Sequence, residues 1–271
     1  MWHDRTHIKL QQILNKAVRE GQIQNNPCFG VDGVARPKRD REKLKKQRLS
    51  KEQAIKLFHI LTNEEKNGNV VAMLLALTTG MRRGEVLALQ WKNVDLDRKK
   101  IRIENQFGKE LILKDPKTQR SRRVISIDDK TVKFLTEWKS EQQKLFKKSI
   151  VKFNKNSPVC SNAVCDFVDP DNFSRWRRKF FIKIGFAKYE KATKWVDKRG
   201  IERVKYSGYV GPTFHALRHA QATLLVAGGV DPKTVQARLG HEKISTTLEI
   251  YAEALEENDE KAAEYIGKLV K

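Results

Sequence analysis

Residues 78–91 read TTGMRRGEVLALQW, and this stretch sets the fold of the chain around it. The apolar residues that lead into it recur with helical spacing and predict a helix over 69–79, which Gly80 interrupts. On the next expected helix, Arg82 and Glu85 are three residues apart and therefore share one face. Gly80, two residues before Arg82, indicates a close backbone approach rather than an ordinary surface helix.

Outward from this stretch the pattern is mainly helical. Ser50 with Gln53 forms a capping box, which predicts the start of a helix over 51–61. Over 100–127 the apolar period changes to two, which predicts three short antiparallel strands. These strands are marked by Ile101/Ile103, Leu111/Leu113 and Ile125/Ile127. Further helices are expected over 4–20, 82–90, 129–148, 171–184, 213–227, 232–239, 245–252 and 256–269. The polar segment 186–212 gives no clear pattern. The fold class is α+β, mainly helical with one small three-stranded sheet.

Composition restricts the class of protein. The 271 residues carry 55 Lys+Arg against 33 Asp+Glu, a formal net charge of +22, and an excess of this size favours a nucleic-acid partner. No stretch approaches the roughly 18–20 apolar residues that span a membrane, and the amino terminus has no signal-peptide pattern. The three scattered cysteines form neither a disulfide framework nor a CxxC metal motif. A soluble, intracellular, polyanion-binding protein is expected.

Two further segments carry chemistry. Residues 215–219 read HALRH, which places His215 and Arg218 on one helical face. Residues 239–241 read LGH, and Tyr251 follows ten residues after that histidine. Taken singly, each feature has an ordinary structural explanation, such as a surface ion pair, a packed histidine or a core tyrosine. Their order along the chain is more specific.

The segments TTGMRRGEVLALQW, DPKTQRSRRVISI, TFHALRHAQATLLVAGG and VQARLGHEKISTTLEIYAE, in this order, resemble the tyrosine recombinases of the phage integrase type. The resemblance covers about 50–265. It implies a catalytic domain over 50–271 with a C-terminal helix at 253–270. Residues 1–35 resemble the end of a helical core-binding domain, and 36–49 form a basic linker. Most of the core-binding domain is absent, so a truncated form or an incomplete reading frame is expected.

The resemblance implies that Tyr251 attacks a DNA phosphate and forms a 3′-phosphotyrosyl link, with no cofactor and no metal ion. Arg82 and Arg218 would hold the phosphate oxygens, and His241 would donate a further hydrogen bond. His215 would accept a proton near the tyrosine or orient the phosphate. The remaining roles fall to Lys117, as general acid for the leaving 5′-hydroxyl, and to Glu85, which would support the geometry of the site.

Two assignments compete with neighbouring residues. The Gly-x-Arg spacing favours Arg82 over Arg83, and the Lys-Thr pair before a basic strand favours Lys117 over Lys114. His219 is expected to be an ordinary helix residue. The basic linker and the predicted hairpin supply the expected DNA contacts, with a solvated surface as the alternative. These contacts are Arg36, Lys38, Arg39, Lys45, Lys46, Arg83, Arg120, Arg122 and Arg123.

The expected partner is double-stranded DNA, with self-assembly into a tetramer on two duplexes. An excisionase or a DNA-bending accessory protein is possible, and a bacterial or phage-encoded cytoplasmic protein of a mobile element is expected. A chromosome-dimer resolvase of the Xer type and a type IB topoisomerase share this chemistry. Two other classes fit less well. A metal hydrolase built on His215, His219 and His241 lacks the glutamate of HExxH, and an inactive DNA-binding module would not need every catalytic position filled.

Overall fold

The structure is a computed structural model that describes residues 2–29, 47–107, 112–114, 122–196 and 201–256. The chain divides into two compact units, Met1–Lys45 and Lys46–Lys271. The division falls inside the basic stretch that the sequence analysis interprets as a linker. No helix among the described residues is long and apolar enough to cross a membrane.

The smaller unit is built on helix α1 (Trp2–Arg19), as the periodicity predicts. The turn after it folds back on the helix, where the Asn26 side-chain amide donates to Asn15 Oδ1 at 2.7 Å. The apolar face remains open, and Ile13 is 63% exposed. One helix and a turn cannot bury such a face, so residues 2–29, the part of this unit that the structure describes, form no hydrophobic core.

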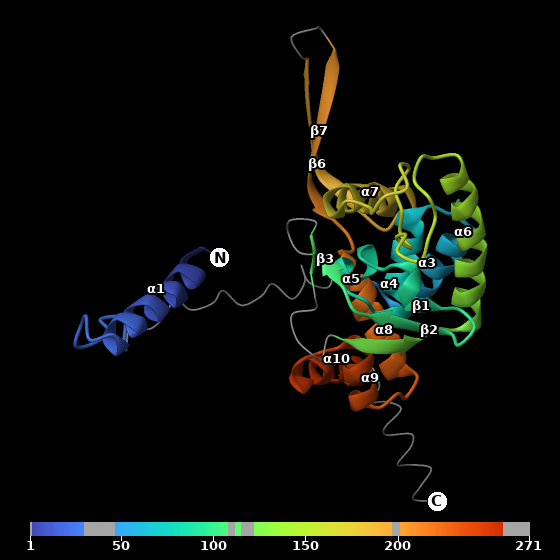
Figure 1. Ribbon diagram of the computed structural model, residues 1–271. Coiled ribbons are helices and arrows are strands. Elements are labelled where there is room, and N and C mark those ends of the chain that lie inside the picture. Colours follow the sequence, from blue (N-terminus) through green and yellow to red (C-terminus); the bar gives the residue numbers. More distant parts are fainter. Residues whose placement is uncertain (1, 30–46, 108–111, 115–121, 197–200, 257–271) are drawn as a thin grey trace, which may run out of the picture. The chain divides into compact units, whose positions relative to one another are not determined.

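The larger unit is mainly helical (Figure 1). Its helices are α3 (Lys51–Asn63), α4 (Gly68–Thr79), α5 (Arg83–Leu87), α6 (Asp129–Lys147), α7 (Pro170–Lys183), α8 (Phe214–Ala227), α9 (Pro232–Leu239) and α10 (Ile244–Glu256), with a 3-10 turn η1 (Trp91–Asn93). The capping box of Ser50 and Gln53 begins α3 as predicted. Asp231 caps α9, where Pro232 occupies the first turn. The expected helix over 256–269 lies almost entirely outside the described residues.

Helix α4 is the centre of the core. All of its residues except Asn69 and Thr78 are buried, as expected for a helix that is apolar on every side. It contacts α3, α5, α6, α7 and α8. It ends at Gly80, whose φ of 68° is left-handed. A Cβ there would lie 2.4 Å from Leu239 Cδ2 and 2.7 Å from Gln221 Oε1, so the close approach that the sequence predicts at this glycine is confirmed.

A second, smaller apolar cluster joins α8, α9 and α10. It consists of Ala222, Val226, Val235, Leu239 and Ile250, with Leu225, Val230 and Tyr251 packed against it. Since α8 also packs on α4, this cluster fixes α9 and α10 to the main core.

The three-stranded sheet differs from the prediction in its strands. Its order is β1 (Val94–Asp95), β2 (Lys100–Ile103), β5 (Arg123–Ser126), all antiparallel. The segment predicted as the middle strand, β4 (Leu113–Lys114), pairs instead with β3 (Gln106–Phe107). The tight turn after β1 brings it onto one edge of β2, while β5 occupies the other. No edge of β2 is then left for β4.

One other expectation needs correction, and one segment without a prediction is now defined. The helix predicted over 82–90 ends at Leu87, because the chain beyond it pairs with a later loop. There Val159 N donates to Leu89 O at 2.8 Å, and Gln90 bridges to Pro158. The segment 186–212, for which no structure was predicted, contains a long antiparallel hairpin of β6 (Lys188–Val196) and β7 (Glu202–Val210).

Candidate functional site

The site begins at the turn between α4 and α5. The Arg82 backbone N–H donates to Glu85 Oε2 and its Nη1 donates to Glu85 Oε1, both at 2.8 Å. The Glu85 side chain is 1% exposed, whereas that of Arg82 is 38% exposed. A buried carboxylate therefore orients the side chain of an arginine that still reaches solvent.

Glu85 has a second partner that the sequence analysis did not assign to it. Arg123 on β5 donates to Glu85 Oε1 at 3.1 Å and to Oε2 at 2.9 Å. The Arg123 side chain is 7% exposed, although the sequence analysis placed it among the DNA contacts. A signal for this was present, because Arg123 has the same strand parity as the buried Ile125 and so faces inward.

Arg218 is buried as deeply as Glu85. It is 2% exposed, and its Nη1 donates to Gly80 O at 2.7 Å. His215 lies one turn earlier on α8 and is exposed. Helix α8 thus presents a buried arginine and an accessible imidazole on the same face, as the spacing predicts.

Three arginines meet at the carboxyl end of α9. The carbonyl of Arg238 accepts from Arg123 Nε at 2.7 Å. The carbonyl of Leu239 accepts from Arg218 Nη2 at 2.5 Å, and that of Gly240 accepts from Arg82 Nη2 at 2.6 Å. The last carbonyls of a helix lack intrahelical partners and carry the negative end of its dipole. They therefore hold three like charges together, and we call Arg82, Arg123 and Arg218 the arginine cluster.

His241 directly follows the three carbonyl-bearing residues Arg238, Leu239 and Gly240 in the sequence. Its Nδ1 lies 2.9 Å from the hydroxyl of the buried Thr247 on α10, and its backbone N–H donates to Gln236 O at 3.1 Å. Thr247 of α10 therefore holds the imidazole, while Gln236 of α9 holds the backbone of His241. These contacts bring His241 to the arginine cluster, since the adjacent Gly240 carbonyl is bound by Arg82.

The charges of the cluster shift the pKa values of the groups around it. Burial by itself raises the pKa of Glu85, but hydrogen bonds and charge from Arg123 and Arg82 outweigh it and hold that pKa below its ordinary value. Desolvation, followed by the charges of Arg82 and Arg123, lowers the pKa of Arg218 to about 9. Desolvation and the positive charges of Arg218 and Arg82 lower the pKa of His215. The site is therefore strongly cationic and is suited to an anion such as a phosphate diester.

We expect acidification from pH 7 to pH 5 to destabilise the protein through His241. Desolvation and the charges of Arg218 and Arg82 lower the pKa of His241 to about 4, whereas a histidine in an unfolded chain titrates near ~6.5. The unfolded state binds the proton first, so the free energy of unfolding falls in this window, by about 1–2 kcal/mol for one such group. Urea unfolding of the wild type and of His241→Asn at both pH values measures this difference.

The matched control is His59→Asn, because His59 is exposed on α3. We expect His241→Asn to lose less stability than the wild type on acidification, and His59→Asn to behave as the wild type does. An equal loss in all three proteins contradicts the prediction.

The structure does not bring the Tyr251 hydroxyl to the arginine cluster. Tyr251 packs against the apolar cluster of α8, α9 and α10, and its hydroxyl donates to the backbone carbonyl of Val230. Burial and the charge of Asp231 raise the pKa of Tyr251. In this conformation the phenol is held in its protonated form, facing the loop between α8 and α9.

Some of the other predicted site residues lie in the described part of the chain, and the rest lie outside it. Arg83 Nη1 donates to Ser174 Oγ on α7 at 2.8 Å, and Arg122 is exposed just before β5. His219, expected to have no catalytic role, lies beside Thr223 one turn further along α8. The remaining predicted residues lie outside the described part of the chain; they are Lys117, Arg36, Lys38, Arg39, Lys45, Lys46 and Arg120.

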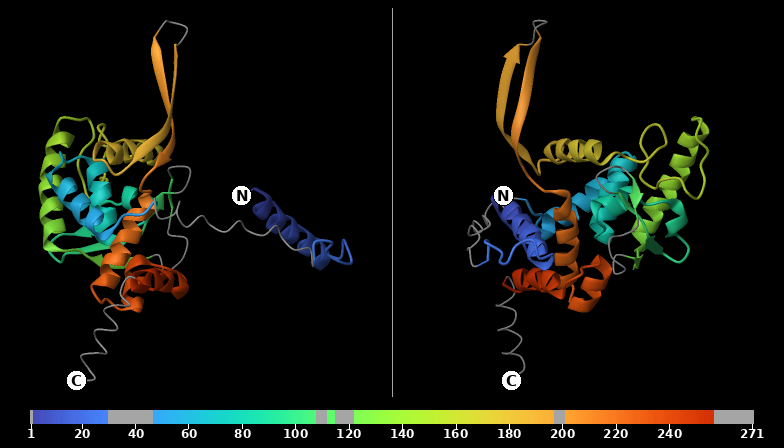
Figure 2. Two further views of the ribbon diagram at one scale, coloured as in Figure 1. Left: turned by 180° about the vertical axis from the view of Figure 1, so that it is seen from behind. Right: turned by 60° about the vertical axis from the view of Figure 1, so that its left-hand side comes forward.

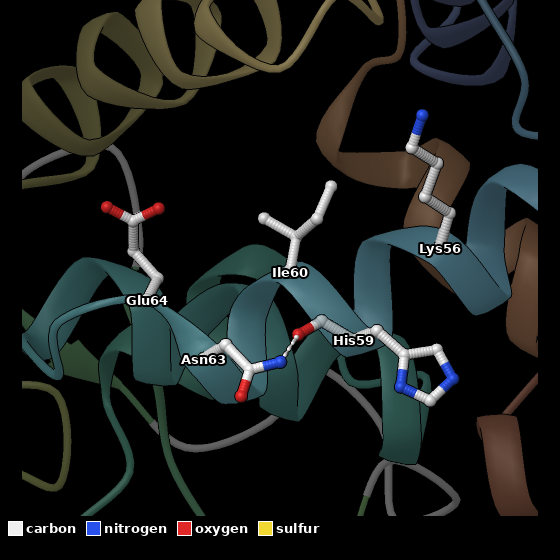
Figure 3. A pocket seen from close by; sticks show the side chains of 5 residues that line it. All are labelled: Lys56, His59, Ile60, Asn63 and Glu64. Carbon is white, nitrogen blue, oxygen red and sulfur yellow. Dashed lines mark hydrogen bonds between the residues drawn. The ribbon is translucent and has the colours of Figure 1, made fainter.

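A metal site and a surface pocket are two further candidates. Within the described ranges, no group of three or more His, Cys, Asp or Glu side chains could hold a metal ion. A shallow pocket lies on α3 (Figure 3), lined by Lys56, His59, Ile60, Asn63 and Glu64. All five side chains come from one face of one helix, and Asn63 bonds only to the His59 carbonyl among the residues drawn. They do not converge on a common point, so this pocket is not a catalytic constellation.

Comparisons with known proteins identify the family of the chain. Residues 47–258 match the phage integrase family. The chain is 27% identical to a tyrosine recombinase XerC-like protein of Caldanaerobacter subterraneus and 28% identical to the ICEBs1 integrase of Bacillus subtilis. Each alignment covers 96% of this chain and 64% of the relative, so the chain spans less than two thirds of their length.

Solved structures show the same fold. The Tn1549 transposon integrase in complex with transposon right end DNA aligns with a TM-score of 0.65 at 19% identity, over 98% of this chain and 78% of the other. XerA recombinase aligns with a TM-score of 0.56 at 21% identity, over 79% and 64%. The family match includes the arginine cluster, His241 and Tyr251, and by this evidence the chain belongs to the phage integrase family of tyrosine recombinases.

Proposed function

We propose that this chain cleaves and rejoins double-stranded DNA by transesterification, as the catalytic part of a site-specific recombinase. The observation that carries the proposal is the convergence of the arginine cluster on the end of α9, with Tyr251 on the helix that follows. Such a cluster holds permanent cations where a phosphate would gain negative charge during attack. The Tn1549 integrase and a lambda integrase dimer, both solved on DNA, support the choice of substrate.

The chemistry follows from the groups present. The Tyr251 oxygen attacks the phosphorus, the bond to the 5′-oxygen breaks, and a 3′-phosphotyrosyl link forms with the bond energy conserved. The Arg82 side chain is 38% exposed and would bind one phosphate oxygen, and the buried Arg218 would add positive charge beside it. The tyrosine proton passes to a base, for which the unprotonated His215 is suited by its lowered pKa. Lys117 is our candidate for protonating the leaving 5′-oxygen.

The nucleophile must change position for this reaction. Its hydroxyl donates to Val230, and a phenol cannot attack phosphorus while it is bound there. Helix α10 is held to the site by the His241–Thr247 contact in its first turn. We therefore propose that Tyr251 leaves the apolar cluster while the start of α10 stays in place.

The biological context is also part of the proposal. We propose that the protein acts in the cytoplasm of a bacterium, on the ends or attachment sites of a mobile element. The ICEBs1 integrase and the Tn1549 transposon integrase are relatives whose names support this assignment. Four protomers acting on two duplexes, with an excisionase or a DNA-bending protein, complete the proposed assembly.

The test is a suicide-substrate assay in EDTA. A nicked duplex from a candidate attachment site lets a short cleaved fragment diffuse away and traps the covalent product. We expect a protease-sensitive band on a denaturing gel that retains the 5′ label of the cleaved strand, because the link is to the 3′ end. An adduct that retains the 3′ label, or cleavage that EDTA abolishes, contradicts the proposal.

A further inference from the structure

The β6–β7 hairpin stands apart from the rest of the larger unit. It joins α7 to α8, and its register runs from Lys188 opposite Val210 to Val196 opposite Glu202. Both views of Figure 2 show it projecting beyond α7, clear of the helices and of the other sheets. Apart from its root, this ribbon therefore contributes nothing to the hydrophobic core.

The root of the hairpin is fixed, whereas its outer part is open. Tyr189 stacks on Tyr206 with ring centroids 5.3 Å apart and meets Tyr209 edge-on. The guanidinium of Arg178 on α7 lies 5.7 Å from the Tyr209 ring. Further out, Trp195 is 46% exposed. A two-stranded ribbon alone is marginally stable in water, so a long open one of this kind indicates a surface that acts by contact with a partner.

The charge of the ribbon indicates which partner it fits. Lys188, Lys191 and Lys194 recur at every third position of β6, and all three are exposed. Alternation along a strand places the first and third on one face and the second on the other. Over 186–212 the sequence has seven Lys+Arg and three Asp+Glu. Cations on both faces of a narrow ribbon suit a polyanion that presents charge on more than one side, as a DNA duplex does.

The ribbon is also continuous with the catalytic surface. Arg83, next to Arg82 of the arginine cluster, donates to Ser174 on α7. Arg178 on the same helix contacts Tyr209 at the root of β7. Helix α7 thus links Arg83, beside the candidate active site, to Arg178 at the base of the hairpin.

We propose that the β6–β7 hairpin is a second DNA-binding element, which contacts duplex phosphates beyond those held at the arginine cluster. The inference rests on the proposed function, because it takes the same DNA as substrate. A nine-residue strand is roughly 30 Å long, close to one helical turn of B-DNA. The hairpin therefore extends the footprint on one side of the cleavage position.

The test removes the three β6 lysines together, as Lys188→Gln, Lys191→Gln and Lys194→Gln. The matched control removes three exposed lysines of α6, Lys133→Gln, Lys144→Gln and Lys147→Gln, which changes the net charge equally. Binding to a labelled duplex is followed by fluorescence anisotropy between 50 and 200 mM salt. We expect the β6 variant to bind about 10-fold more weakly than the α6 variant, with a salt slope shallower by about 2–3.

Hydroxyl-radical footprinting supplies the second readout. We expect the β6 variant to lose protection over about one helical turn at one end of the footprint, and the α6 variant to keep it. Equal affinity, equal salt slope and an unchanged footprint in the two variants overturn the proposal. Thermal melting of both variants checks that folding is intact, which is expected because all six side chains are exposed.

Failure of the hairpin proposal can be distinguished from failure of the proposed cleavage chemistry. The wild type and the β6 variant are also compared for covalent adduct on the suicide substrate. An adduct formed by both proteins with equal duplex binding refutes the hairpin proposal alone. Weakened binding of the β6 variant without an adduct from the wild type supports the hairpin and counts against the chemistry.

Discussion

Tyr251→Phe is expected to abolish the covalent DNA adduct while leaving duplex binding nearly unchanged. The phenol oxygen is the only atom removed, and the proposed reaction has no other group to form the phosphotyrosyl link. In the structure this hydroxyl donates to the Val230 carbonyl, so its loss costs about 1 kcal/mol of folding stability. The ring still packs against the apolar cluster of α8, α9 and α10. The measurement is the suicide-substrate gel, read beside an electrophoretic mobility shift of the same duplex.

Tyr209→Phe is the matched control for this change. Tyr209 is partly buried at the root of β7, and its hydroxyl also donates to a backbone carbonyl, that of Pro212, at 3.1 Å. The Tyr209→Phe variant therefore loses the same hydroxyl and the same kind of hydrogen bond as Tyr251→Phe, at a residue that has no part in the proposed reaction. We expect Tyr209→Phe to retain the adduct. A full-strength adduct from Tyr251→Phe removes Tyr251 as the nucleophile.

The sequence predicted those features that depend on local pattern. The helix that Ser50 begins follows from capping chemistry, and the break at Gly80 follows from its left-handed backbone. Arg82 and Glu85, three residues apart, are joined by hydrogen bonds as expected, although Arg82 is the N-cap of α5 and does not lie within the helix. Each of these features involves residues only a few positions apart, so the sequence contains most of the information.

Features that depend on distant contacts were missed. Arg123 binds Glu85 across 38 positions, and only the fold brings that strand to α5. The partner of β4 depended on which edge of β2 was already occupied. The position of Tyr251 is set by packing among three helices. No local pattern specifies it.

Glu85→Gln is expected to lower the free energy of unfolding by about 3 kcal/mol at pH 7, because it leaves two guanidiniums with a neutral partner in a buried place. The carboxylate is 1% exposed and accepts from both Arg82 and Arg123. Gln keeps the shape, but its amide N–H₂ faces a guanidinium and cannot accept. Adduct formation is expected to slow by about 10–100-fold, as when a supporting partner of a reactive group is lost. Chemical denaturation and the suicide-substrate rate measure the two effects.

The pH dependence identifies the cause of this loss. The pKa of Glu85 is held below its ordinary value, so its contribution is complete above about pH 4.3 and is lost as pH falls through the folded-state pKa. The stability gap between the wild type and Glu85→Gln should therefore narrow only in acid. Glu65→Gln, at an exposed position of the same charge, should show no gap.

In a double-mutant cycle, Glu85→Gln with Arg123→Gln should cost less stability than the sum of the single changes, because the second change removes a cation that the first leaves unpaired. Strict additivity would mean that this buried pair is not what holds the arginine cluster in place.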